Sequence, residues 1–339
     1  CEKDAKINVP NQKYLDLFFY EDISNKQLAK MWKRELVVLP RFLIKPAYLL
    51  NKLISKYLTF TKKHIITLLN LDRDVHNLMD KSQPHLQFTK EEIELGEKFL
   101  NKFGISRNSK FVCLIVRDDA YLEFLSPEKD WSYHAYRDFN VNNFLEAAEV
   151  LASRGYYVFR MGKKVKKKFE SKNKKIIDYA NLEEKSDFLD MYLGANCNFC
   201  ISTGCGFDAI PYIFRAPIAY ITVPIQLFAS FSKKFLIITK HHYSKKLQRK
   251  LKFNEIINRK IGKFNKKDEF DKNDLILKEN SSLEIKEFII EMIDRYENKW
   301  KENDQSQLMQ NKFWKLYKIF IKENNIEHLH GKILSNMSV

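Results

Sequence analysis

Five short apolar runs alternate with helical patterns between residues 111 and 223, and this alternation most strongly constrains the fold. Continuous apolar runs of this length are typical of strands covered on both faces. The runs are FVCLIVR at 111–117, YYVFRMG at 156–162, KIIDYA at 175–180, FCIST at 199–203 and IAYITV at 218–223. Helical patterns occupy 142–153, 186–197 and 207–214. Strands and helices in this order predict an α/β protein with a parallel, Rossmann-like sheet.

Further helical patterns flank this region. Thr89 and Glu92 form a capping box at the start of a helix that Gly104 ends. Beyond the last run, residues 225–275 read as irregular and basic, whereas 282–300 and 306–321 read as helices. A length of 339 residues allows more than one core. We therefore expect a mainly helical N-terminal region over 1–105, a Rossmann-like domain over 106–280 and C-terminal helices over 281–339.

The segment from Leu28 to Leu71 combines apolar and basic residues at helical spacing. Two interpretations stay open, namely a helix buried in a core and a helix that lies on a membrane surface. The segment is not expected to cross a bilayer, because its apolar stretch is interrupted by Arg41, Lys45, Pro46, Lys52 and Lys56.

The formal net charge of +16 is concentrated in two windows. Residues 161–175 carry eight lysines and one acidic residue, and residues 233–263 carry eleven basic residues and one acidic residue. Such patches attract nucleic acid, anionic lipid or phosphorylated substrates, although they are equally explained as solvated surface lysines. The chain has no RNA-reading aromatic signature, so nucleic acid is the less favoured partner.

The five cysteines suit a reducing compartment better than a disulfide framework, which favours a cytoplasmic protein. Cys197, Cys200 and Cys205 form a CxxC followed by a third thiol, but no fourth ligand stands at zinc spacing. We therefore expect buried thiols and no metal. The chain begins with Cys1 rather than Met, which suggests a processed or missing amino terminus.

Three of the predicted strands end in an unusual set of charged, hydroxyl and glycine residues. The first ends in Arg117, Asp118 and Asp119, the second in Arg160, Gly162 and Lys163, and the fourth in Ser202, Thr203, Gly204 and Gly206. Ligands of parallel sheets gather at the carboxyl ends of the strands, near the free amides of helix N-termini. Guanidinium groups and backbone amides both bind phosphate oxygens, so the sequence predicts a phosphate site at this edge.

The loop sequence GCGFDA also fits a dinucleotide-binding fingerprint. That fingerprint belongs after the first strand of its domain, with an acidic residue about twenty positions later that holds the ribose. Here about three strands precede the loop, and the next strand ends in TVPIQ without an acid. A dehydrogenase is therefore disfavoured, whereas a purely structural turn stays an alternative.

Four stretches resemble a family of bacterial glycosyltransferases associated with surface-polysaccharide gene clusters. They are CLIVRD, YRDFNVNNFLEAAEVLASRGYYVFRMGK, IIDYAN and SDFLDMYLGANCNFCISTGCGFDAIPYIFRAPIAYI, and together they cover roughly residues 110–225. The resemblance implies a GT-B arrangement, in which two Rossmann-like domains face each other and the carboxyl-terminal one binds a nucleotide sugar. It implies transfer of that sugar to a glycan or lipid-linked acceptor near the inner face of a membrane. The residues before the capping box are too few for a full Rossmann domain, so the resemblance implies a reduced or truncated acceptor domain.

The resemblance also assigns roles to individual residues. The loop residues Ser202, Thr203, Gly204, Cys205 and Gly206 would present amides or hydroxyls to the donor diphosphate, and Arg160, Gly162 and Lys163 would contact the same group. Arg117 stands where strand-end arginines bind the diphosphate in a distantly similar fucosyltransferase group, although the preceding histidine of that group is replaced here by Ile115 or Val116. Because these groups would neutralise the charge of the phosphates, we expect the protein to need neither a metal nor a cofactor.

Several assignments have open alternatives. The general base must be a carboxylate or histidine near the acceptor, and Asp118, Asp119 and His134 are the candidates. Asp208 either complements the helix dipole or meets a donor hydroxyl. Arg137 and Asp138 either face the same cleft or form an exposed ion pair. At the level of the whole protein, the alternatives to a glycosyltransferase are a nucleic-acid-binding protein and a catalytically inactive structural relative.

Overall fold

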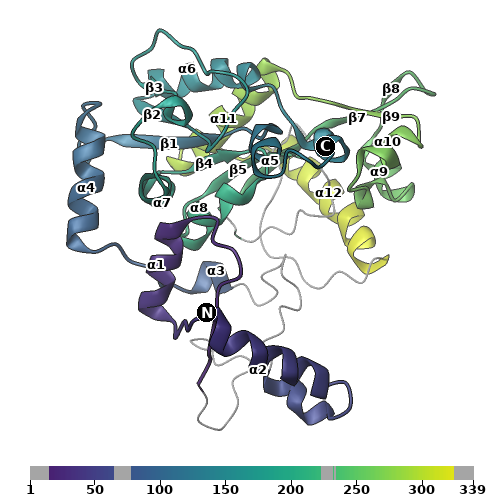
Figure 1. Cartoon of the computed structure of the whole chain (residues 1–339). Helices are drawn as coiled ribbons and strands as arrows, with labels where there is room; N and C mark the ends of the chain where they lie inside the picture. The colour runs from purple at the N-terminus through teal and green to yellow at the C-terminus, as the bar shows by residue number, and fades with distance from the viewer. Residues whose placement is uncertain (1–14, 65–77, 223–231, 233, 324–339) are drawn as a thin grey trace.

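The computed structural model of the protein describes residues 15–64, 78–222, 232 and 234–323. A six-stranded sheet with the order β3-β2-β1-β4-β5-β6 lies at its centre, and every pair of neighbours is parallel (Figure 1). The predicted α/β class with a parallel sheet is therefore confirmed. The strands are β1 (Lys110–Ile115), β2 (Tyr156–Met161), β3 (Ile176–Ile177), β4 (Cys200–Ser202), β5 (Ile218–Thr222) and β6 (Leu236–Thr239).

The direction of strand addition reverses between β1 and β4. From β1 the chain moves outward to β2 and β3, and it then returns to place β4 on the other side of β1. The register pairs Cys113 with Cys200 and Ile115 with Ser202, so the two strands end at the same level. Such a reversal is a topological switch point, where a crevice forms outside the carboxyl ends of the strands.

Both faces of the sheet are covered by helices. Val112 and Leu114 of β1 point into one core, whereas Cys113 and Ile115 point into the other, as the alternation along a strand requires. The first core is completed by α6 (Leu145–Ser153) and α11 (Ser282–Tyr296), and the second by α4 (Lys90–Asn101) and α7 (Asp187–Asn196).

Two of these helices lie outside the range 106–280 predicted for the sheet domain. Phe99 and Leu100 of α4 are buried in the core on one face, and Phe288 and Ile289 of α11 are buried in the core on the other. The sheet and its two helical layers therefore form one packed unit, which extends past residues 105 and 280.

The prediction that residues 225–275 are irregular was wrong for the described residues 234–275, whereas 225–231 and 233 lie outside the described part of the chain. β6 extends the main sheet, and a second, antiparallel sheet has the order β8-β7-β9. Its core contains Phe270, Phe313 and Tyr317. The strands escaped notice because they are only two to four residues long and basic residues flank them. The elements are β7 (His241–Ser244), β8 (Arg249–Lys250), β9 (Leu275–Lys278), α9 (Phe253–Asn258), η7 (Ile261–Lys263), α10 (Lys267–Asp271) and α12 (Asp304–Glu323).

The described part of the N-terminal region contains helices separated by non-helical stretches such as residues 15–25. Its first helix packs on the sheet domain, because Met31 is buried beside Met191 and Ile210, and Lys26 N donates to Asp187 Oδ2 at 2.7 Å. The elements are α1 (Lys26–Glu35), α2 (Arg41–Ile54), η1 (Thr59–His64) and α3 (Leu78–Lys81).

The two helices within residues 28–71 differ in burial. α1 contributes buried residues to a core, whereas no residue of α2 is buried. The core interpretation is therefore right for α1 and wrong for α2, and residues 65–71 lie outside the described part of the chain. Among the described helices, none is both long enough and apolar enough to cross a membrane.

Glu92 joins α1 to α4. Its carboxylate completes the predicted capping box by accepting from Thr89 N at 2.9 Å, and it also accepts from Gln27 Nε2 at 2.7 Å. It forms ion pairs with Arg34 and, at 3.2 Å, with Lys30. The bond from Arg34 is the largest of the effects that hold the pKa of Glu92 well below its ordinary value.

We predict that Glu92→Gln lowers the free energy of unfolding at pH 7 by about 2 kcal/mol, because Arg34 loses its buried partner. A carboxylate with a depressed folded pKa stabilises above its unfolded pKa, near 4.5, and this contribution is lost at lower pH. The difference between wild type and variant should therefore shrink below pH 4.5 in urea titrations. Glu97→Gln is the control, since Glu97 is in the same helix and its pair with Arg107 is exposed. An equal loss in both variants would contradict the assignment.

Candidate functional site

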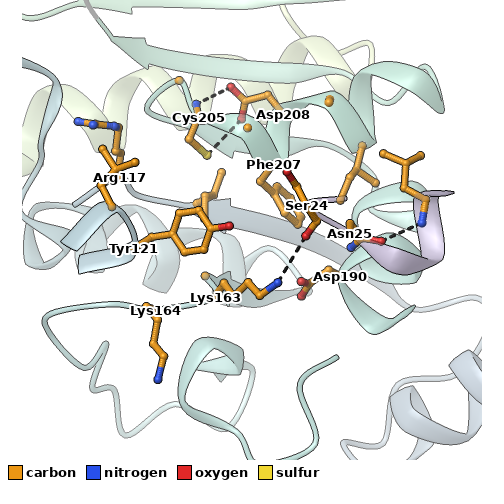
Figure 2. Close-up of a pocket in the computed structure, with 18 of the residues that line it drawn as sticks. Ser24, Asn25, Arg117, Tyr121, Lys163, Lys164, Asp190, Cys205, Phe207 and Asp208 are labelled. Carbon is orange, nitrogen blue, oxygen red and sulfur yellow. Dashed lines mark hydrogen bonds between the residues drawn. The ribbon is translucent and has the colours of Figure 1, made fainter. Parts of the chain in front are cut away.

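A pocket of about 890 Å³ lies at the carboxyl ends of β1, β2 and β4, beside the switch point (Figure 2). Arg117, Gly162 and Gly204 line it from the three strand ends. The opposite wall is formed by the N-terminal segment from Tyr20 to Trp32. Strand ends that are far apart in the sequence thus meet at one cavity, as expected for this sheet.

The loop at 202–208 is closed by Asp208. One oxygen of its carboxylate accepts from Cys205 N at 3.0 Å, and the other accepts from the Ser202 hydroxyl. Ser202 Oγ in turn accepts from Gly204 N at 2.9 Å. The amides of Gly204 and Cys205, which were predicted to face a phosphate, are therefore paired inside the loop. A phosphate reaches them only when these side chains turn away. Closing this loop is a role of Asp208 that neither of its two predicted interpretations included.

Thr203 ties the same loop to β1. Its hydroxyl accepts from Arg117 N at 2.7 Å, and its own N–H donates to Ile115 O at 3.2 Å. Ser202 and Thr203 are completely buried and do not line the pocket. In this conformation their hydroxyls hold the strand ends together instead of facing a ligand.

Three glycines near the pocket differ in their backbone conformation and in the space around them. Gly204 has a φ of 81°, in the left-handed region that favours glycine. A Cβ at Gly206 would meet nothing within 4 Å, so this position is open to the pocket. Gly162, in the loop after β2, has a φ of 153°, and its Cβ would come within 2.6 Å of Val165 Cγ1.

Arg117 and Arg137 both line the pocket, but they are bonded differently. Arg117 is paired with Asp138 and donates to His134 O at 3.2 Å, so its guanidinium lies at the edge of the pocket (Figure 2). Arg137 Nη2 donates to Gly204 O at 2.7 Å, and its buried Nε has no hydrogen-bond partner among the described residues. Arg137 therefore faces the cleft, while Asp138 neutralises Arg117 rather than Arg137.

Arg160 is not part of the pocket lining. Its side chain is 1% exposed and forms an ion pair with Asp178 at 3.2 Å. Arg160 lies before the end of β2, so its side chain points to a face of the sheet rather than over its edge. The expected contact between Arg160 and a diphosphate is not available in this conformation.

Lys163 lines the pocket from the loop that follows β2. Its Nζ lies 3.4 Å from both Ser24 O and Asp187 Oδ1, so it reaches across to the N-terminal wall (Figure 2). Lys164 also lines the pocket, but its amine is placed over the Phe124 ring at 4.7 Å. Lys163 therefore remains a candidate for binding an anion.

The two predicted aspartate bases have structural partners. Asp118 lines the pocket, and its oxygens accept from Ala120 N at 3.1 Å and Lys166 N at 2.9 Å. Asp119 lies outside the lining and forms an ion pair with Lys166 Nζ at 2.5 Å. Asp118 is thus inside the pocket and accepts hydrogen bonds from two backbone amides. Asp119 lies outside the lining and holds Lys166, which belongs to the lysine-rich loop at 161–175, here called the lysine loop.

His134 is the third predicted base, and it lines the pocket from η2 (Ser132–Arg137). The centroid of its ring lies 4.0 Å from the centroid of the Tyr133 ring. Its buried Nδ1 has no hydrogen-bond partner within the described ranges. Burial, then the charges of Arg117 and Arg137, lower the pKa of His134. The imidazole is therefore neutral at pH 7 and can accept a proton.

Other lining residues were missed by sequence reasoning. Asp190 in the first turn of α7 accepts from the Tyr179 hydroxyl at 2.9 Å, and burial raises its pKa to about 6. Tyr121 of α5 (Ala120–Leu125) directs its hydroxyl into the hollow (Figure 2). The N-terminal wall was missed as well, because no local pattern shows that residues 20–32 pack against strand ends more than eighty residues later.

The charges of the lining are balanced. Burial raises the pKa of Asp208 to about 6, so Asp190 and Asp208 both take up protons in mildly acidic solution. Four basic and four acidic side chains line the pocket: Arg117, Arg137, Lys163, Lys164, Asp22, Asp118, Asp190 and Asp208. The net charge of the pocket lining is therefore close to zero at pH 7, and it becomes more positive as the pH falls.

Burial distinguishes the two thiols of the CxxC from the third thiol. Cys197 and Cys200 are buried in the same core, whereas Cys205 lines the pocket. Burial raises the pKa of the Cys205 thiol, so it stays protonated near neutral pH. Across the described residues, no group of three or more His, Cys, Asp or Glu side chains is placed to hold a metal ion.

Comparison with known proteins gives one structural similarity. No protein-family model and no curated protein matches the chain. Among solved structures, the chain is similar to the glycosyl transferase family 9 structure from Veillonella parvula DSM 2008, with 11% sequence identity and a TM-score of 0.33. The match covers 63% of this chain and 54% of the other, so the chain spans about half the length of that structure.

We predict that Thr203→Val destabilises the fold by about 1–3 kcal/mol, because the buried Arg117 N–H loses its acceptor while side-chain volume is kept. Urea denaturation measures the loss. Ser153→Ala is the matched control, since its hydroxyl bonds only the exposed Val150 carbonyl at a helix end. Equal stability of Thr203→Val and wild type would show that the two strand ends do not depend on this contact.

Proposed function

We propose that the protein is a glycosyltransferase of GT-B type, which moves a sugar from a nucleotide-sugar donor to a glycan or lipid-linked acceptor in surface-polysaccharide synthesis. The observation that carries this proposal is the pocket at the β1–β4 switch point, with basic side chains at the strand ends on one side and the N-terminal wall on the other. A volume of about 890 Å³ suits a ligand as large as a nucleotide sugar. The sequence resemblance over residues 110–225 supports the same class.

The donor diphosphate is proposed to lie between Arg137 and Lys163, over Gly206. The buried Nε of Arg137 has no hydrogen-bond partner in the described part of the chain, and the contacts of Lys163 are long, so both cations can turn toward a phosphate. Gly206 leaves room for close approach because no side chain projects there. A phosphate that displaces the Asp208 carboxylate would gain the amide of Cys205 as a further donor.

Transfer breaks the bond between the anomeric carbon and the diphosphate oxygen and forms a bond from that carbon to an acceptor hydroxyl oxygen. Negative charge develops on the leaving diphosphate, where Arg137 and Lys163 stabilise it. The acceptor proton passes to a base, and we assign this role to the neutral imidazole of His134, with Asp190 as the alternative. The acceptor enters from the N-terminal wall, beside Ser24 and Tyr121.

The protein is proposed to act in the cytoplasm at the inner face of the membrane, without a metal or cofactor.

The lysine loop at 161–175 is a weaker argument for nucleic acid than its charge suggests. Lys166 is paired with Asp119 and Glu123, and Lys163 is paired with Asp187. The cations of the loop are thus partly neutralised by the protein itself.

Isothermal titration against a panel of nucleoside diphosphates tests the donor site. Arg137→Gln and Lys163→Gln should each weaken nucleotide binding about tenfold, because each removes a charge-assisted hydrogen bond to phosphate. Lys172→Gln is the control, since Lys172 is an exposed lysine of the same loop outside the pocket. Binding to RNA with a steep salt dependence, and to no nucleotide, would replace the proposal with the nucleic-acid function. Nucleotide binding without turnover of any donor would identify an inactive relative.

The affinity for a nucleotide sugar should rise as the pH falls from 7 to 5. Asp190 and Asp208 have pKa values of about 6, so they lose negative charge in this window, whereas the ligand diphosphate keeps its own. Titration calorimetry at several pH values measures the effect. Asp190→Asn should flatten the profile, and an unchanged profile in this variant would remove Asp190 from the donor side of the pocket.

A further inference from the structure

α2 carries an apolar stripe on its exposed side. The stripe residues recur at helical intervals and therefore share one face of the helix. Phe42 is 75% exposed and Tyr57, just beyond the helix, is 82% exposed. The apolar stripe consists of Phe42, Leu43, Leu49, Leu50, Leu53 and Tyr57. Contiguous apolar surface of this kind marks a contact site rather than an ordinary surface.

A basic row runs along one edge of this stripe. The row consists of Arg41, Lys45, Lys52 and Lys56, whose spacing of four and seven places them on adjoining positions of the helix. No acidic residue occurs from residue 41 to residue 64. Glu21 pairs with Arg41 at 2.8 Å and with Lys45 at 2.9 Å, which leaves the Lys52 and Lys56 end of the row with the least neutralised charge.

From this arrangement we propose that α2 is a membrane-docking helix, which inserts its apolar stripe between the headgroups of an anionic phospholipid bilayer. An apolar stripe beside a basic row is the pattern of helices that lie in the membrane interface. A second copy of the chain fits less well, because an antiparallel twofold contact between the stripes would bring the two basic rows to the same edge. Nucleic acid would use the basic row and leave the stripe exposed to water.

α2 is suited to lie in the interface rather than to span it. Its 14 residues extend about 21 Å, less than the hydrocarbon thickness of a bilayer. Figure 1 shows α2 at the lower end of the molecule, apart from the central sheet.

The helix is also coupled to the pocket. Phe18 forms a β-bridge with Val38, and the rings of Phe19 and Tyr48 lie 5.9 Å apart, so the segment before α1 is anchored on α2. The same segment supplies Tyr20 and Ser24 to the pocket wall. Docking of α2 would therefore place the acceptor side of the pocket near the lipid headgroups. This last step rests on the proposed function, whereas lipid binding itself does not.

Co-sedimentation of the full chain with vesicles tests the proposal, using phosphatidylcholine alone and phosphatidylcholine mixed with phosphatidylglycerol. No nucleotide or glycolipid is present, so the outcome is independent of sugar transfer. The wild-type chain should bind the anionic vesicles, and Leu49→Ser with Leu53→Ser should lower the affinity about tenfold. Lys52→Gln with Lys56→Gln should lower it by a similar factor and reduce its dependence on phosphatidylglycerol.

Two control pairs make the test specific. Leu283→Ser with Leu308→Ser changes leucines that are 53% and 54% exposed on other helices, and it should leave vesicle binding intact. Lys172→Gln with Lys174→Gln removes charge from the lysine loop and should have a smaller effect than the pair in α2. Equal losses in the control pairs, or no binding of the wild type to either vesicle, would overturn the proposal. A wild-type dimer that the stripe variant converts to a monomer would instead identify a second copy as the occupant.

Discussion

Thr203 joins the ends of β1 and β4 at the place where the strand order reverses, and the geometry of the pocket depends on this junction. Its buried hydroxyl holds the Arg117 amide, and its own amide holds the Ile115 carbonyl. In a buried site an unpaired amide costs about 1–3 kcal/mol, so both contacts strongly favour one conformation of the two loops. The adjoining Gly204 carbonyl is thereby placed to accept from Arg137, which brings η2 over the same cavity.

Asp208 occupies the place that is proposed for a phosphate of the donor. Its carboxylate accepts from the Cys205 amide inside the loop. A carboxylate buried in this way is costly to ionise, which is why its pKa rises to about 6 although three donors contact it. An incoming phosphate would compete with Asp208 for the same amide. For this reason, the near-neutral charge of the pocket lining is compatible with the proposed binding of a diphosphate.

Much of the sheet could be predicted from the sequence, because its signals are local. The runs at 111–117, 156–162, 199–203 and 218–223 correspond to β1, β2, β4 and β5, and the Thr89 capping box marks the start of α4. β6 and the second sheet were missed because short strands flanked by lysines carry little periodic signal. The burial of Arg160 could not be foreseen either, since it depends on where β2 ends and not on residue type.

The candidate site was predictable only in part, for the same reason. Arg117, Gly162, Lys163 and Gly204 meet at one pocket because the carboxyl ends of parallel strands share an edge, which the sheet class alone implies. Which amides are free, which aspartates are paired and which arginine faces the cavity depend on side-chain contacts across the fold. The N-terminal wall is the clearest case, because its position follows from the packing of α1 on α7.

That wall gives the pocket two unequal sides. The sheet side is rigid, with strand ends fixed by Thr203 and by two packed helical layers. On the other side, none of residues 20–25 before α1 is buried, and α2 itself has no buried residue. A chain segment with so few buried contacts is the part of the site whose position can respond to what α2 touches. Any control of access to the pocket would therefore act through the N-terminal wall rather than through the sheet.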